Sequence, residues 1–314
     1  IGHGPFSHAL ESTLLPNGNH EEVSVIIMQH LNRMFDNRLA LALDIFQDRY
    51  SRQFFHQLVS SQLDIDRLDY LQRDSFFTGV SEGTIGSDRI IKMLDVHEGQ
   101  LVVEEKGIYS IENFLNARRL MYWQVYLHKT SVAAEKMMVL LLKRAQYLVR
   151  SGVSIPVSEG LGKFLTKEIS TSQLSANTEL LEAYCLMDDY DIWAGIKSWQ
   201  NHEDRVLSSI SRMFLSRELF QIRLEFKPFA TTDQDEIKAG ITKVYHTNAK
   251  DAEFLFDHGE ISNAAYISGS TGINIKMKKG QVLDIASASD LPNIAALGKI
   301  VKKFYLTWPK SVNL

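Results

Sequence analysis

The residues that could do chemistry gather near the start of the chain. Four of the ten histidines fall within the first thirty residues, and three of them, His3, His8 and His20, share this stretch with Glu11. His8 and Glu11 are three positions apart, so on a helix they lie on the same face. Imidazole and carboxylate groups together can transfer protons or bind a metal. On spacing alone, the cluster fits a polar site and a set of structural histidines about equally well.

A second set of charged residues lies in the segment DIDRLDYLQRD. On a helix, Asp66, Tyr70 and Asp74 follow i, i+4, i+8 spacing and form one stripe. Asp69 and Arg73 are also four positions apart and fit a solvent-exposed ion pair, worth only a few tenths of a kcal/mol. The two carboxylates at the start of the segment fit this interpretation less well, because they flank an isoleucine.

A third set follows the same spacing on a later helix, where Arg118, Tyr122 and Tyr126 form one stripe, with His128 and Lys129 just beyond. A guanidinium group beside phenol rings can hold a phosphate together with the face of a base or sugar. The alternative is an amphipathic helix whose tyrosines are half buried in the core. Spacing alone favours that alternative.

Composition restricts the classes of protein. The chain has 34 basic and 38 acidic residues, a formal charge of −4. This argues against a protein that coats nucleic acid or an anionic membrane, since either task favours a basic excess. No run approaches the roughly 18 to 20 apolar residues that span a bilayer, so we expect no membrane partner. The single cysteine, Cys185, excludes an intrachain disulfide, fits the reducing cytoplasm, and is expected to be a small buried hydrophobe.

Residues 1–225 are expected to be mostly helical, because glycine and proline are few and apolar residues recur with helical periods. Asn19 and Glu22 resemble a capping box at the start of a helix, which would place His20 in its first turn. One short strand is expected at 101–103. Helices are predicted at 6–14, 21–35, 37–59, 62–77, 87–95 and 111–150, and through most of 158–217.

The pattern changes after residue 225. The segments KVYHTN, AAYIS, INIKM and QVLDI are short and β-prone, and glycine or polar turns separate them. A last helix is expected near 290–303. The sequence therefore predicts a mainly α protein with two domains, a helical domain at 1–225 and a smaller α+β region at 226–314.

These segments resemble one known family. The opening IGHGPFSH resembles the segment that directly follows the His-Asp doublet of HD-domain phosphohydrolases, and more narrowly the deoxynucleoside triphosphate triphosphohydrolase branch. DIDRLDY is similar to the later aspartate motif of that family, and the stretch from Arg118 to Lys129 resembles its nucleotide-gripping helix. The matches come in the family's order over about residues 1–150. The resemblance implies an HD helical bundle, a homo-oligomer, and hydrolysis of a dNTP to a deoxynucleoside and triphosphate.

The resemblance also implies roles for particular residues. Asp66 matches the last of four metal ligands; the other three would precede Ile1, so we expect the chain to be a fragment of a longer protein. His20 matches the histidine proposed for proton transfer, Glu11 replaces the aspartate that often orients it, and His3 matches a histidine beside the scissile phosphate.

The predicted substrate contacts come from all three segments. Tyr122 stands where some relatives carry a histidine, which leaves the substrate open. The implied cofactor is a divalent metal ion, and the residue types do not choose among manganese, iron, nickel, zinc and magnesium. Two alternatives stay open: hydrolysis of another phosphate ester, and a nucleotide-binding regulatory protein with weak or lost catalysis. The predicted substrate-binding residues are His8, Arg67, Tyr70, Asp74, Arg118, Tyr122 and Tyr126.

Overall fold

A computed structural model describes residues 1–16, 18–263, 265–269 and 272–313. The chain forms two compact units. The first unit comprises Ile1–Asp36, Lys129–Glu260 and Lys303–Leu314, and the second comprises Asn37–His128 and Ile261–Lys302. This division does not follow a single boundary near residue 225, and the division into domains at 1–225 and 226–314 stays a prediction.

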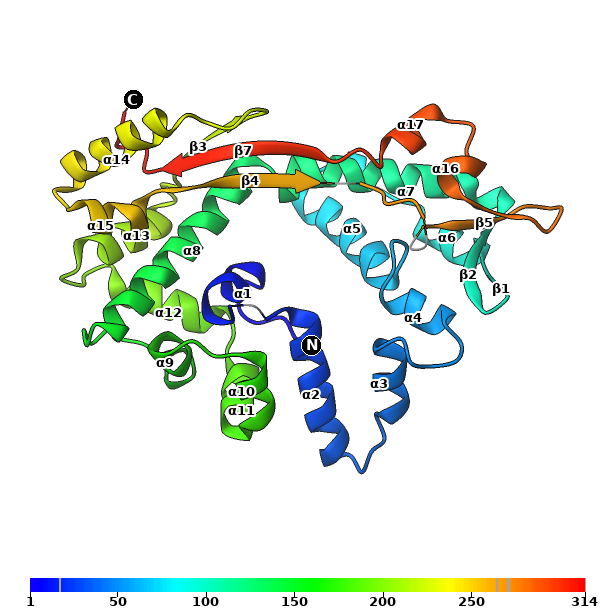
Figure 1. Cartoon of the computed structure of the whole chain (residues 1–314), viewed down its shortest axis with the longest axis horizontal. Helices are drawn as coiled ribbons and strands as arrows, with labels where there is room; N and C mark the ends of the chain where they lie inside the picture. The colour runs from blue at the N-terminus through cyan, green and yellow to red at the C-terminus, as the bar shows by residue number, and fades with distance from the viewer. Residues whose placement is uncertain (17, 264, 270–271, 314) are drawn as a thin grey trace. The chain divides into compact units, whose positions relative to one another are not determined.

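Both units are mainly helical, and each also carries strands (Figure 1). A four-stranded sheet has the order β1-β2-β5-β6 and a three-stranded sheet the order β3-β7-β4. The predicted class, mainly α with a smaller C-terminal α+β region, is confirmed. No helix within the described ranges combines the length and the apolar character that crossing a bilayer requires.

The elements of the first unit lie in three separate stretches of the chain. Strands β4 and β7 extend beyond the residue ranges of this unit. The elements are α1 (His8–Leu14), α2 (His20–Met34), α8 (Lys129–Arg150), α9 (Glu159–Thr166), α10 (Thr171–Ala176), α11 (Thr178–Leu186), α12 (Asp189–Trp199), α13 (Arg205–Ser216), β3 (Gln221–Glu225), α14 (Thr231–Tyr245), α15 (Ala249–Ala252), the 3-10 turn η4 (Glu253–Leu255), β4 (Asp257–Asn263) and β7 (Val301–Trp308).

The elements of the second unit begin with two short helices and end with two more. They are α3 (Ala40–Phe46), α4 (Phe54–Val59), α5 (Ile65–Thr78), the 3-10 turn η1 (Ser81–Gly83), α6 (Ser87–Met93), β1 (Leu94–His97), β2 (Gln100–Glu104), the 3-10 turn η2 (Glu105–Gly107), α7 (Ile108–Met121), the π-helical turn η3 (Tyr122–Tyr126), β5 (Asn274–Lys276), β6 (Val282–Asp284), α16 (Ile285–Ala288) and α17 (Pro292–Ala296).

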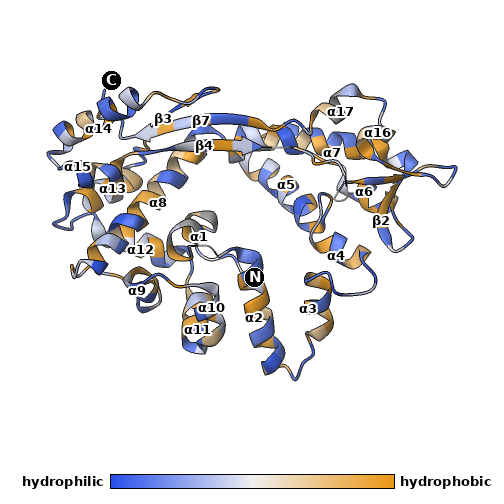
Figure 2. Ribbon diagram, in the orientation of Figure 1, coloured by the Kyte–Doolittle hydropathy of each residue, from blue (hydrophilic) through white to orange (hydrophobic). Residues whose placement is uncertain are grey.

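Helix α8 forms the centre of the first unit and packs against α1, α9, α13 and β3. Met137, Met138 and Leu140 to Leu142 are all buried in the core of this unit. Orange and blue residues alternate along the helices in Figure 2, as helices with one buried face require. The Gln146 amide donates to the carbonyl oxygen of Thr13 over 3.0 Å, which attaches α8 to α1.

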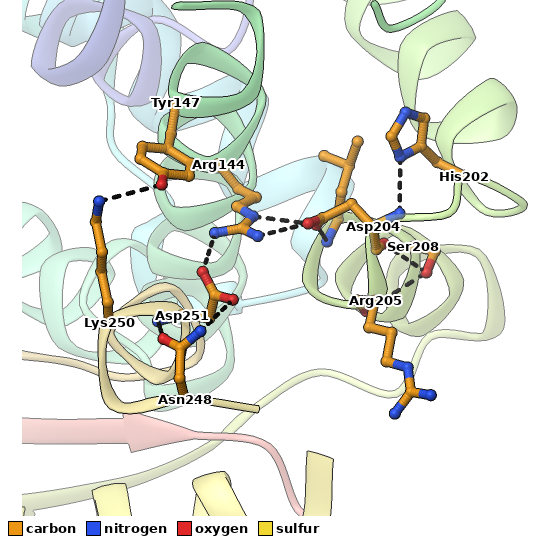
Figure 3. Close-up of polar contacts among 10 residues, drawn as sticks. Arg144, Tyr147, His202, Asp204, Arg205, Ser208, Asn248, Lys250 and Asp251 are labelled. Carbon is orange, nitrogen blue, oxygen red and sulfur yellow. Dashed lines mark hydrogen bonds and ion pairs between the residues drawn. The ribbon is translucent and has the colours of Figure 1, made fainter. Parts of the chain in front are cut away.

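A buried ion network fixes α8 to two other elements (Figure 3). The Arg144 guanidinium donates through Nε and Nη2 to the two carboxylate oxygens of Asp204, over 3.0 and 2.5 Å, and through Nη1 to Asp251 over 2.6 Å. The Arg144 side chain is 4% exposed. Asp204 also caps α13, because its carboxylate accepts from the Leu207 amide. One arginine thus connects α8, the start of α13 and α15.

The second unit has its own hydrophobic core, in which Leu71 of α5, Phe114 of α7 and Ile275 of β5 are fully buried. Strand β2 pairs with β1 in antiparallel and with β5 in parallel fashion, with Val103 opposite Ile275. The predicted strand at 101–103 is therefore confirmed, and so are strands in INIKM and QVLDI.

The prediction of one helix over 111–150 is wrong. Helix α7 ends at Met121, a π-helical turn follows, and α8 begins at Lys129. The wide turn is defined by the Leu127 amide, which donates to the Tyr122 carbonyl five residues earlier over 2.6 Å. Bulky Tyr122, Trp123, Val125 and Tyr126 occupy this turn, and such turns often occur at functional sites.

Three further predictions of secondary structure are wrong. Within KVYHTN, residues through Tyr245 form the last turn of α14, because the buried helical face of Ile237 and Ile241 outweighs the local β preference. Near 290–303 the helix is only α17, and β7 follows because it pairs with β3. The expected helix at 37–59 is divided into α3 and α4, with a positive φ of 55° at Asp48 between them.

The expectation for the only cysteine is also wrong. Cys185 is exposed on α11, although its neighbours Ala183 and Tyr184 are buried. Cys185 lies three positions after the exposed Glu182, so it falls on the same, solvent-facing side of α11.

We expect Arg144→Met to lower the free energy of unfolding by about 3–5 kcal/mol at neutral pH, because two largely buried carboxylates lose their counter-charge. Lys163→Met is a matched control. It removes a cation that pairs with the exposed carboxylates of Glu159 and Glu179, and should change the free energy of unfolding far less than Arg144→Met does. Urea-induced unfolding measures both differences.

The effect of Arg144→Met should also depend on pH. Burial acts to raise the pKa of Asp204, but the bonds from Arg144 and Leu207 more than offset it, so this pKa lies below its usual value. A carboxyl group with a lowered pKa in the folded state stabilises the fold above the unfolded pKa of about 3.9, and loses that contribution as the pH falls through the folded pKa. The advantage of wild type over Arg144→Met should therefore shrink below about pH 4. Equal differences in neutral and acidic solution would contradict this explanation.

Candidate functional site

In the first unit, His20 and Glu11 form a hydrogen-bonded pair. His20 is the first residue of α2, and Asn19 caps that helix by accepting from the Glu22 amide over 2.8 Å. His20 Nδ1 lies 3.0 Å from Glu11 Oε1, and the two side chains are 31% and 15% exposed. The pair has the geometry of a histidine oriented by a carboxylate, an arrangement that suits proton transfer.

His3 lies directly against this pair. Its ring stacks on that of His20, with centroids 4.1 Å apart and an angle of 24° between the planes. The backbone before it is held at Gly2, whose amide donates to Ser24 Oγ over 2.9 Å and whose carbonyl accepts from the Tyr184 hydroxyl over 2.8 Å. A Cβ at Gly2 would lie 2.1 Å from the His20 carbonyl oxygen, so only glycine fits there.

The structure thus brings His3, Glu11 and His20 together, and their catalytic roles stay predictions. His8 begins α1, and its side chain lies outside the described residues, as do those of Ser12, Asn293 and Ala295. Sequence reasoning missed Ser24 and Tyr184, which hold the backbone beside His3. No local signal marks Tyr184, because it comes from a helix more than 180 residues away.

In the second unit, Asp64 organises the start of α5. Its carboxylate accepts from the Arg67 amide over 2.7 Å and from the Ser61 amide over 3.2 Å, and it forms an ion pair with the Arg67 guanidinium. Arg67 Nη1 also donates to the Ser61 carbonyl. Asp64 is only 2% exposed, and burial raises its pKa although the bonds from Arg67 oppose the shift. An aspartate just before an amphipathic helix is an N-cap signal that would have identified it.

The other aspartates of this helix differ in their surroundings. Asp66 lies in the first turn of α5 and is exposed. Asp69 and Arg73 form the expected i,i+4 ion pair, with both side chains more than half exposed.

Three tyrosines predicted to contact substrate form one aromatic cluster. The ring of Tyr126 lies edge-on to those of Tyr70 and Tyr122, with centroids 6.0 and 5.4 Å away. Its hydroxyl donates to Asp74 over 2.7 Å. The Arg118 guanidinium carbon lies 5.8 Å from the centroid of the Tyr122 ring. Burial is the main cause that raises the pKa of Tyr70 to about 12, so this phenol stays neutral and can donate a hydrogen bond.

Arg118 carries a buried charge without enough acceptors. It is 7% exposed, and its Nε and Nη1 atoms have no hydrogen-bond partner among the described residues. Arg67 Nε is also buried without a hydrogen-bond partner among the described residues. Buried unpaired donors are costly and rare in native proteins, and an ion is one of their ordinary explanations. The oxygen atoms of a phosphate would satisfy these donors.

The implied metal finds an incomplete ligand set in this chain. Among the residues that the structure describes, no three histidine, cysteine, aspartate or glutamate side chains are grouped so as to hold an ion. Asp66 contributes one carboxylate by itself. These residues do not form a metal centre on their own, and the assignment of Asp66 as a ligand stays a prediction.

The chain is similar to one described family and to several known proteins. The family described as HD associated region matches residues 85–151. A solved phosphohydrolase of Bacteroides thetaiotaomicron is 47% identical with a TM-score of 0.94, over 98% of this chain and 77% of that one. The uncharacterized protein YwfO of Bacillus subtilis is 32% identical over 73% of this chain and 52% of its own length. A deoxynucleoside triphosphate triphosphohydrolase SAMHD1 homolog of Dictyostelium discoideum is 29% identical over 44% of this chain and 30% of its own length.

The class that emerges is a mainly helical protein with an HD-associated region. The similarity to the solved phosphohydrolase covers both chains well, so the chain belongs to the HD-domain phosphohydrolase superfamily. The chain spans only about half the length of YwfO.

Two substitutions at Asp64 should separate its roles as helix cap and as counter-ion. Asparagine is about as good a cap as aspartate, whereas alanine accepts no bond from the Arg67 amide. We expect Asp64→Ala to lower the free energy of unfolding by about 1 kcal/mol more than Asp64→Asn, since both lose the ion pair and only one loses the cap. Denaturant titration provides the measurement. Identical losses in the two variants would show that the cap contributes nothing.

Proposed function

We propose that this protein is a nucleotide phosphohydrolase that cleaves a deoxynucleoside triphosphate into a deoxynucleoside and triphosphate. The observation that carries the proposal is Arg118, a buried guanidinium with two unpaired nitrogens beside a cluster of tyrosines. Membership of the superfamily supports the reaction class, and similarity to the Dictyostelium deoxynucleoside triphosphate triphosphohydrolase homolog supports the substrate class.

In this proposal the second unit binds the nucleotide. Arg118 and Arg67 neutralise phosphate oxygens, since a guanidinium presents a fork of donors that matches them. The tyrosine rings offer apolar faces for the sugar and base, and Asp74 fixes the Tyr126 hydroxyl. Because Asp64 and the Ser61 carbonyl occupy one end of the Arg67 guanidinium, its remaining N–H groups are those that can bind phosphate.

The proposed proton-transfer pair is His20 with Glu11. Hydrolysis forms a bond between a water oxygen and phosphorus and breaks the bond to the 5′ oxygen of the sugar, which must receive a proton. Glu11 holds Nδ1 of His20, so Nε2 is the atom that delivers this proton. His3 stacks on the same ring and restricts its rotation.

The proposal also includes a requirement for a divalent ion, with Asp66 as the ligand that this chain contributes. It further includes a homo-oligomer and a cytoplasmic location. Each of these follows from the resemblance or the composition and is tested separately from the reaction.

The reaction itself is tested with a nucleotide panel. The protein is purified together with the preceding segment that the resemblance expects to hold the other three metal ligands, freed of metal with a chelator, and then supplied singly with manganese, iron, nickel, zinc or magnesium. We expect one or more ions to restore release of a deoxynucleoside and intact triphosphate, separated by ion-exchange chromatography. Release of inorganic phosphate alone would point to a different phosphate ester. Binding without any product under every ion would favour a regulatory protein.

Arg118→Ala should raise KM for the triphosphate at least about tenfold, because it removes charge-assisted bonds to phosphate. Arg118→Lys should not restore the wild-type KM, since a lysine cannot provide the guanidinium fork. Arg119→Ala is the matched control, because Arg119 is the same residue type one position further along α7. An equal effect at positions 118 and 119 would mean that general charge, rather than the buried guanidinium, binds the nucleotide.

His20→Ala should lower kcat by about 10² or more and leave KM nearly unchanged, because proton transfer acts in the transition state. His30→Ala, on the same helix, serves as the control and should retain activity. Steady-state kinetics distinguish the two. An unaltered kcat in His20→Ala would return His20 to a structural role at the start of α2.

A further inference from the structure

A pocket lies in the second unit, and none of Arg118, Tyr70, Tyr122 and Tyr126 is among its lining residues. Its volume is about 290 Å³, and its walls come from α4, the segment before α5, strand β2 and the start of β5. Five of the described lining residues carry side-chain amides: Gln53, Gln57, Gln62, Gln100 and Asn274. The Gln62 amide is engaged with the backbone of Ile267, because its Nε2 donates to the Ile267 carbonyl and its Oε1 accepts from the Ile267 amide.

The base of this pocket is apolar and rigid. Leu63, Val102, Val103 and Ile273 line it and are each no more than 4% exposed. Val103 and Ile273 belong to the core of the second unit, so this surface is fixed by packing. Binding pockets commonly combine such an apolar surface with a few oriented polar groups.

The amides are oriented by a chain of hydrogen bonds that begins at the backbone. The Leu101 amide donates to Gln57 Oε1 over 2.7 Å, which places the Gln57 nitrogen on the other side. That nitrogen donates to Gln100 Oε1 over 2.6 Å, and the Gln100 nitrogen donates to Gln53 Oε1. Each amide nitrogen carries two hydrogens, and the chain uses one from Gln57 and one from Gln100. Further N–H groups therefore remain on these amides for a ligand.

His56 adds an acceptor to the same wall. Its Nδ1 lies 3.0 Å from the Ile45 carbonyl oxygen, and a carbonyl can only accept, so Nδ1 carries the proton. In the neutral ring Nε2 is then a bare acceptor. The pocket thus offers donors and an acceptor over an apolar surface.

The charge of the lining decides the class of ligand. Among the described residues that line the pocket, there is no lysine or arginine, and Asp48 is the one carboxylate. A phosphate group would meet no cation there. Amide N–H groups near an acceptor such as His56 Nε2 can bond the polar edges of nucleobases, which carry both donors and acceptors.

We propose that this pocket binds the base of an uncharged nucleoside or a free nucleobase. The flat ring lies on the apolar surface and its polar edge faces the amides. This binding does not depend on the proposed hydrolysis, because no residue of the pocket takes part in phosphate binding or proton transfer.

The test is isothermal titration calorimetry of the whole protein with purine and pyrimidine nucleosides, the corresponding free bases, and deoxynucleoside triphosphates. We expect at least one base to bind both as the nucleoside and in free form. Gln57→Leu should weaken that binding about tenfold or more, because the remaining Gln57 N–H is lost and the Gln100 amide is no longer held in place. Gln53→Ala should also weaken the binding of the base. Gln53 is exposed, so this variant keeps the proposal testable if Gln57→Leu does not fold.

The control compares variants of the two sites, each tested for the ligand of the other site. Arg118→Ala should leave nucleoside binding unchanged, whereas the glutamine variants should leave KM for the triphosphate unchanged. The proposal is overturned if no nucleoside or base binds, or if Gln53→Ala and a folded Gln57→Leu both bind like wild type. It is equally overturned if Arg118→Ala abolishes nucleoside binding, since that result would assign the ligand to the tyrosine cluster. Hydrolysis is assayed separately, so its failure leaves this test intact.

Discussion

The first unit depends on one buried arginine. Arg144 binds Asp204 at the start of α13 and Asp251 of α15, and it lies on the central helix α8. Helix α8 in turn bonds to α1 through Gln146, and α1 carries the glutamate that orients His20. Breaking a buried ion pair leaves unpaired charge in a poorly solvated place, which makes this network hard to disrupt and the histidine pair well supported.

The chain contains two buried arginines with opposite surroundings. In Arg144, Nε, Nη1 and Nη2 all donate to carboxylates, whereas two nitrogens of Arg118 have no acceptor among the described residues. The first arrangement is complete within the fold and stabilises it. The second is incomplete and lies beside the Tyr122 ring, so the missing acceptors must come from a ligand or solvent. The contrast separates a structural guanidinium from a binding one by hydrogen bonding alone.

Much of this could be predicted because it is local or follows helical spacing. Glu11 and His20 are nine residues apart, and Asp74 and the tyrosines lie on regular stripes. The π-helical turn could not be predicted from period alone, because the spacing of Tyr122 and Tyr126 fits a continuous α-helix equally well. The amide pocket was also inaccessible, because Gln57 and Asn274 come from segments that are more than 200 residues apart in sequence and adjoin only in the folded unit.

Ser61 belongs to two environments at once. Its amide donates to Asp64, its carbonyl accepts from Arg67, and the same residue lines the amide pocket. A shift of this single stretch of backbone would reach both places. Thermodynamic linkage then makes the influence mutual: whatever factor an occupant of the pocket imposes on anion affinity at Arg67, the anion imposes on the occupant. One short segment before α5 is therefore where cooperativity between two ligands would arise in this unit.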